Sequence, residues 1–315
     1  MKTLAALIAC TLTACVDVGS AALWAKDAPH AAAGTNRAAE RNLPGIKYDG
    51  KRAVTLHYGD LTVTVAGERG SDANSRVPVF TGRYRDRDVF SFRIEEAEAE
   101  EPNATAEVMR LDPATSQPQV VMTAFTFGAH CCTITRIATV LGSGEWRVLD
   151  AGQLDGEGYR FVDIDNDGAK ELVSIDNSFL YAFDSYAGSY APTRITKLSG
   201  SDLDDVTTEP KYRAFLRRKL QDMEADAKKD PNLWHSNGFL GGWVAAKSLV
   251  GEVDDAWKRM LASYDRNSDW SLEECTTGQE LDQCPKDKVR QQTFPEALKK
   301  VMESNDYPLP KSERR

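Results

Sequence analysis

The spacing of hydrophobic positions along the chain changes near residue 200. Before that point, short runs of β-branched and aromatic residues alternate with polar positions and are separated by Gly, Asp and Asn, a pattern typical of antiparallel strands. The clearest strands are expected at residues 53–59, 61–67, 89–94, 119–127, 134–141, 145–152 and 171–183. Residues 45–200 therefore predict a β-rich domain, an open sheet or a sandwich.

After residue 200 the apolar positions recur every three or four residues. Pro210 stands where the first turn of a helix would begin, a position that suits proline because its missing N–H has no intrahelical partner there. Further helices are expected at 238–249, 252–264 and 295–304, and the last is preceded by Thr293 with Glu296 at capping-box spacing. Strands followed by helices predict an α+β protein with a helical domain at residues 201–315.

The first 44 residues follow neither pattern. Residues 1–15 combine one positive charge, an apolar run and small residues before Cys15, which is typical of an export signal. The end of this segment resembles the lipobox of bacterial lipoproteins, which implies lipidation of Cys15. The alternative is an ordinary signal cut near Ala25. Residues 16–44 are expected to form a linker. The first 44 residues together predict an exported protein that is either periplasmic or anchored to the outer membrane.

Composition and charge narrow the classes of function. A chain of 315 residues with 41% hydrophobic content is long enough for two globular domains. Its formal net charge of −9 disfavours binding to nucleic acid, which requires basic surface. Apart from the signal, no apolar run in the sequence reaches the roughly 18 residues of a membrane-spanning helix, so membrane contact is expected only through the lipid anchor.

Residues 163–171, DIDNDGAKE, place acidic side chains at alternate positions around Gly168, which permits a sharp turn. Hard oxygen ligands in such a loop favour calcium over zinc. Neighbouring carboxylates repel each other by on the order of 1 kcal/mol per pair, and a cation removes that cost. The alternative is an Asx-rich turn that holds no ion. The expected ligands are Asp163, Asp165, Asp167, the carbonyl oxygen of Ala169, and Glu171.

The residues that follow this loop distinguish two calcium-binding motifs. An EF-hand requires an acidic residue at position 12 and then a helix, whereas Ser174 occupies that position and a predicted strand follows. The nine-residue loop between strands instead resembles the FG-GAP and VCBS repeats of integrin-like proteins, which implies a structural calcium site. Aligning Gln119 with Glu171 reveals a second loop, 111–119, that has lost its ligands. About three such units fit the β-rich region, fewer than a closed propeller needs.

The cysteines that follow the signal form two pairs in the sequence. Cys131 and Cys132 follow His130 in a GAHCC segment, which is similar to a segment of exported bacterial proteins without an assigned function. A strained vicinal disulfide is favoured, since neighbouring Cα atoms lie about 3.8 Å apart. Packing of two thiols, or a soft-metal site that includes His130, are the alternatives. Cys275 and Cys284 predict a local disulfide that contributes about 2–3 kcal/mol.

These observations favour a non-catalytic protein of the cell envelope. In this hypothesis calcium stabilises a binding module for a protein or glycan partner. The sequence lacks the common motifs of hydrolases, metalloproteases and nucleotide-binding enzymes. Two alternatives stay open: an exported hydrolase that acts on envelope polymers, and a metal or redox module at His130, Cys131 and Cys132.

Overall fold

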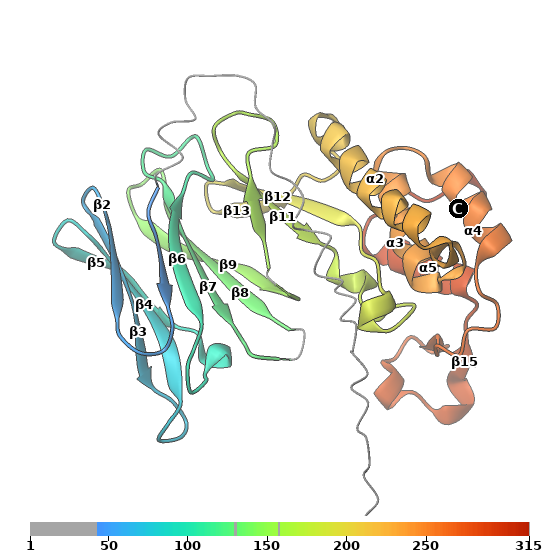
Figure 1. Cartoon of the computed structure of the whole chain (residues 1–315), viewed down its shortest axis with the longest axis horizontal. Coiled ribbons are helices and arrows are strands. Elements are labelled where there is room, and N and C mark those ends of the chain that lie inside the picture. The colour runs from blue at the N-terminus through green and yellow to red at the C-terminus, as the bar shows by residue number, and fades with distance from the viewer. Residues whose placement is uncertain (1–42, 129–130, 157, 315) are drawn as a thin grey trace, which may run out of the picture. The chain divides into compact units, whose positions relative to one another are not determined.

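The computed structural model describes residues 43–128, 131–156 and 158–314 (Figure 1). Several open antiparallel sheets are followed by a helical region, which confirms the α+β fold class. The predicted signal with Cys15, the linker up to residue 42 and His130 lie outside the described residues.

Three antiparallel sheets make up the β-rich part. The first has the strand order β1-β6-β7-β8-β9, with bounds Gly45–Tyr48, Ala104–Met109, Gln119–Phe125, Thr133–Val140 and Trp146–Leu154. The second contains β2 (Val54–Tyr58), β3 (Leu61–Arg69), β4 (Arg76–Tyr84) and β5 (Arg87–Arg93). The third contains β10 (Arg160–Val162), β11 (Glu171–Ile175), β12 (Thr193–Ser199) and β13 (Asp202–Asp205).

The first sheet is buried on both faces, as strand β7 shows. Side chains of a strand alternate between faces, and Val120 and Met122 belong to the core shared with the second sheet. Val121 points the other way, into a core with Leu172 of β11 and Leu198 of β12. Each fully buried side chain of this size contributes about 1.5–3 kcal/mol relative to exposure. Burial on both sides explains why β7 is almost continuously apolar.

The helical region shares its core with the third sheet. It contains α2 (Arg213–Lys229), α3 (Asn237–Leu249), α4 (Val253–Ser263) and α5 (Phe294–Ser304), and a hairpin of β14 (Glu273–Cys275) and β15 (Val289–Gln291). Ile195 of β12 belongs to the same apolar cluster as the helices. Helix α3 lies so close to the loop before β12 that a Cβ at Gly242 would clash with the carbonyl oxygen of Tyr190.

The strand expected at 171–183 is shorter in the structure. It ends at Ile175, and the short 3-10 helix η3 (Asn177–Phe179) follows. Asp176 causes this change because its Oδ1 accepts a hydrogen bond of 3.0 Å from the N–H of Ser178 and so caps the turn. The residues beyond η3 then lie outside the sheet, and Phe183 packs into the core of the helical region.

Candidate functional site

The acidic loop connects β10 to β11 and brings three aspartates together. One ligand atom from each of Asp163, Asp165 and Asp167 lies within 4.8 Å of the others. Asn166 and Gly168 adopt φ angles of 60° and 86°, in the left-handed region that asparagine and glycine tolerate best. These two residues turn the chain so that the alternate side chains converge.

Hydrogen bonds to loop amides occupy one oxygen of each aspartate. Asp163 Oδ2 accepts from the N–H of Gly168 at 3.3 Å, and Asp167 Oδ1 accepts from the N–H of Ala169 at 2.8 Å. Asp165 Oδ1 accepts from the N–H of Asp167 at 3.2 Å. The other oxygen of Asp163, Oδ1, is buried and has no hydrogen-bond partner among the described residues. A buried carboxylate oxygen without a partner is costly, and a calcium ion would supply the missing contact.

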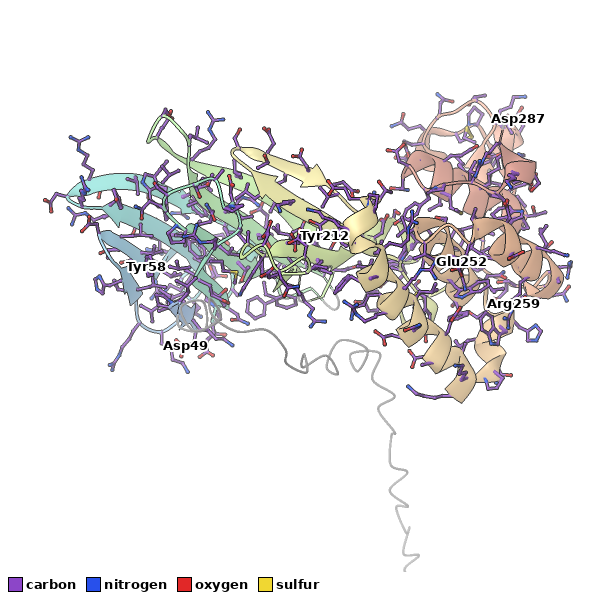
Figure 2. The ribbon with its side chains drawn as sticks, turned by 90° about the horizontal axis from the view of Figure 1, so that it is seen from above. Asp49, Tyr58, Tyr212, Glu252, Arg259 and Asp287 are labelled. Atoms are coloured by element: carbon purple, nitrogen blue, oxygen red, sulfur yellow. A yellow bond between two sulfur atoms is a disulfide. The ribbon has the colours of Figure 1, made fainter. Side chains whose placement is uncertain are left out.

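Glu171 lies outside the cluster of aspartates, although the sequence placed it among the ligands. It is fully buried. Its Oε2 accepts from the N–H of Ile164 at 2.9 Å, and its Oε1 accepts from the hydroxyl of Tyr212 at 3.0 Å. Burial is the main reason that the pKa of Glu171 is raised. Glu171 therefore holds the loop from behind and joins it to the entry of the helical region, where Tyr212 lies (Figure 2).

Two lysines that the sequence analysis did not identify also reach the loop. Lys197 of β12 lies 2.7 Å from Asp167 Oδ2, and Lys211 of η5 (Pro210–Tyr212) lies 2.9 Å from Asp165 Oδ2. The hydrogen bond that Lys211 donates to Asp165 is the main cause that raises the pKa of Lys211. Burial raises the pKa of Asp167, but the bonds from Lys197 and Ala169 outweigh it and lower that pKa. Two ammonium groups face four carboxylates, so two negative charges remain when all four are ionised, which suits a divalent ion.

The loop at 111–119 has a similar construction, but the positions that correspond to the three aspartates carry no acid. Gln119, at the position of Glu171, is fully buried, and its Oε1 accepts from the N–H of Leu111 at 2.7 Å and of Asp112 at 3.2 Å. Its Nε2 donates to Thr115 Oγ1 at 2.7 Å. An amide thus provides a donor inside this loop. In the acidic loop the residue equivalent to Gln119 is Glu171, and it and the aspartates offer only acceptor oxygens when ionised. The acidic loop therefore suits a cation.

The two cysteine pairs lie far apart in the sequence, and both are bonded in the structure. Cys131 pairs with Cys132, and Cys275 of β14 pairs with Cys284 across a Cα–Cα distance of 5.7 Å. Next to the first pair, Asp155 Oδ1 lies 3.9 Å from the Sγ of Cys132. The sequence did not identify this carboxylate, because the turn after β9 brings it there from 23 residues away.

No helix among the described residues combines the length and the apolar content that a membrane-spanning helix requires.

Comparisons with known proteins identify relatives. The model of the sll0997 C-terminal domain matches residues 213–306. The "Uncharacterized protein y4bJ" of Sinorhizobium fredii is 39% identical over 269 residues, which are 85% of this chain and 42% of that protein. The "Probable thylakoid lumen protein sll0997" of Synechocystis is 34% identical over 259 residues, 80% of this chain and 75% of that protein. The chain thus spans about two fifths of the first relative and three quarters of the second. No solved structure matches it.

Proposed function

This chain belongs to the sll0997 family, and from that premise we propose that it is an exported, non-catalytic binding protein whose acidic loop holds a structural calcium ion. The observation that carries the proposal is the buried Oδ1 of Asp163, which lacks a partner among the described residues and lies beside the carboxylates of Asp165 and Asp167. The resemblance of the loop to FG-GAP and VCBS repeats supports calcium. The printed name of the Synechocystis relative, a probable thylakoid lumen protein, supports export across a membrane.

In this proposal calcium acts on the structure and takes no part in a reaction. Asp163, Asp165 and Asp167 would bind the ion. Their attraction to the ion would outweigh the repulsion between their negative charges. The loop that they form is joined through Glu171 to Tyr212, immediately before α2. An ion in the loop would therefore also stabilise the connection between the third sheet and the helices.

Two exposed aromatic side chains are candidates for contact with a partner. Phe127 is 49% exposed and Tyr181 is 48% exposed. Both have left-handed backbones, with φ angles of 60° and 59°, which is rare for large side chains. Strained backbone that presents an aromatic ring to solvent is a feature of binding sites. The proposed partner is a protein or a glycan of the envelope.

Thermal unfolding tests the role of calcium. Protein treated with a chelator should unfold at a lower temperature than protein with calcium at about 100 times its dissociation constant, a condition that stabilises the folded state by about 2.7 kcal/mol. Asp163→Asn should abolish this difference. Asp86→Asn is the matched control, because Asp86 lies exposed in the turn between β4 and β5. An equal calcium response in all three proteins would contradict a site in this loop.

A second experiment separates a binding protein from an exported hydrolase. Calcium-loaded protein would be incubated with purified peptidoglycan, and both the bound fraction and the soluble fragments would be measured. The proposal expects no release of fragments. It also expects that Phe127→Ala and Tyr181→Ala weaken any binding without changing thermal stability. Release of fragments by the protein itself would favour the hydrolase and contradict a non-catalytic role.

A further inference from the structure

The two sulfur atoms of the Cys131–Cys132 pair have different surroundings. Cys132 is only 4% exposed, whereas Cys131 is partly exposed. Gln153 Nε2 lies 3.6 Å from the Sγ of Cys131, and Asp155 Oδ1 lies 3.9 Å from the Sγ of Cys132. Cys131 is therefore the residue of the pair that solvent reaches, and Cys132 lies inside next to a carboxylate.

We propose that this pair is a thiol–disulfide exchange site that oxidises a dithiol on another protein. Exchange requires an accessible sulfur for the incoming thiolate and a second sulfur that departs. The exposure of Cys131 assigns the first role to it, and the burial of Cys132 assigns the second. The proposal concerns residues outside the calcium loop and does not depend on an ion there.

The reaction balances with the partner dithiol as the reductant. One partner thiolate attacks the Sγ of Cys131 and forms a mixed disulfide, and the bond between Cys131 and Cys132 breaks with its electron pair on Cys132. The second partner thiol then loses its proton to solvent and attacks the first partner sulfur. The partner leaves as a disulfide, and Cys131 and Cys132 become two thiols. Two electrons pass from the partner to this protein.

Asp155 is a positioning residue for the departing sulfur. A thiolate is poorly solvated in a buried place, so its departure is easier when a proton reaches it at once. In its protonated form Asp155 passes its carboxyl proton to the Sγ of Cys132 as the bond between the two cysteines breaks, and it then takes a new proton from solvent. Gln153 has a different task, because its amide donates towards the Sγ of Cys131 and stabilises negative charge there.

The segment that carries the pair is fixed to the neighbouring strand. The N–H of Cys132 donates to Thr126 Oγ1 at 2.7 Å, and the N–H of Thr126 donates to the carbonyl oxygen of Cys132 at 2.9 Å. The next residue along the chain from Thr126 is Phe127, whose exposed ring packs edge-on against Phe125 with 5.5 Å between the centroids. An exposed apolar ring in the segment that bonds to Cys132 suits a thiol carried on a peptide better than a small charged thiol.

The test compares the two disulfides in one sample of the whole exported protein. Oxidised protein would be treated with reduced dithiothreitol for graded times, quenched with acid and alkylated with iodoacetamide. Trypsin then yields peptide 111–136 with Cys131 and Cys132, and peptide 267–286 with Cys275 and Cys284. Cys284 is also partly exposed, so exposure alone does not distinguish the pairs. We expect reduction of the first pair to be at least about tenfold faster.

Variants then test the individual roles. Cys132→Ser incubated with oxidised glutathione should carry glutathione on Cys131, whereas Cys131→Ser should react at least about tenfold more slowly at Cys132. Asp155→Asn should slow reduction and remove one ionisation from its pH profile. Asp150 lies in β9, which precedes the turn that holds Asp155, and it is paired with Arg136, so Asp150→Asn should leave the profile unchanged. Three results would each overturn the proposal. The two disulfides could be reduced at equal rates, or the two aspartate variants could behave equally. The third result is free Cys131 and Cys132 thiols that hold zinc in the untreated protein.

Discussion

The bond between Tyr212 and Glu171 is expected to contribute measurably to stability, because it is the point at which the acidic loop is joined to the helical region. Replacement of Tyr212 by phenylalanine removes only the hydroxyl group. Glu171 Oε1 would then keep Lys197 Nζ at 3.7 Å as its nearest charged partner, beyond hydrogen-bond distance. The carboxylate would remain buried with its negative charge incompletely solvated.

The expected loss follows from the burial of both partners. Both Glu171 and Tyr212 are fully buried. A hydrogen bond to a charged group contributes about 1.5–3 kcal/mol, whereas a bond between neutral groups contributes about 0.5–1.5 kcal/mol. We therefore expect Tyr212→Phe to lower the free energy of unfolding by about 2 kcal/mol.

Urea unfolding, followed by tryptophan fluorescence, measures this loss. Tyr159→Phe is the control, because the Tyr159 hydroxyl donates to a neutral acceptor, the carbonyl oxygen of Ala151, at 3.0 Å. The control should lose less stability than Tyr212→Phe. Glu171→Gln and the double variant complete a cycle, whose coupling energy should exceed about 1 kcal/mol. A coupling energy near zero, or a larger loss in the control, would refute the reasoning.

Three further predictions concern charge and packing. Lys211→Met removes an ammonium group that competes with calcium for Asp165. Calcium affinity measured by calorimetry should therefore rise about fivefold, the equivalent of roughly 1 kcal/mol for a partly exposed pair. Unchanged affinity would contradict this competition. The hydrogen bond that Lys247 donates lowers the pKa of Glu252. The stabilisation by ionised Glu252 is therefore present above the usual glutamate pKa and is lost as the pH falls through the lowered value. In Glu252→Gln, the free energy of unfolding should decrease less on the acid side of its pH dependence. Gly242→Ala should lower the free energy of unfolding by about 1–3 kcal/mol in urea titrations, because helix α3 would have to move away from the loop before β12 that holds Tyr190.

The helices followed closely from the sequence, and the strands did so less well. Residues 238–249 and 252–264 were expected to be helical, and α3 and α4 span Asn237–Leu249 and Val253–Ser263. Their apolar period and flanking residues are local signals. Strand β4 (Arg76–Tyr84) was not expected, because Pro78 normally argues against a central strand. Its position is determined by pairing with β3 and β5, which local sequence does not encode.

The acidic loop could be predicted from its spacing, but its surroundings could not. Alternate aspartates and a glycine within nine residues define the turn by themselves. The contacts from Lys197, Lys211 and Tyr212 come from segments 26 to 41 residues beyond Glu171 and depend on how β12 and η5 pack. On its own strand Lys197 has the pattern of an exposed charge. The contacts of Glu171 could not be predicted for the same reason, since the hydroxyl that it accepts from belongs to a distant segment.

Direct titration of calcium shows whether the acidic loop binds an ion. Chelator-treated protein would be titrated with calcium in a calorimeter, beside Asp163→Asn and the control Asp86→Asn. One calcium ion should bind per chain in the original protein and in the control. Binding should be lost or strongly weakened in Asp163→Asn. Absence of calcium binding in the original protein, or equal binding in Asp163→Asn, would contradict a calcium site in the acidic loop.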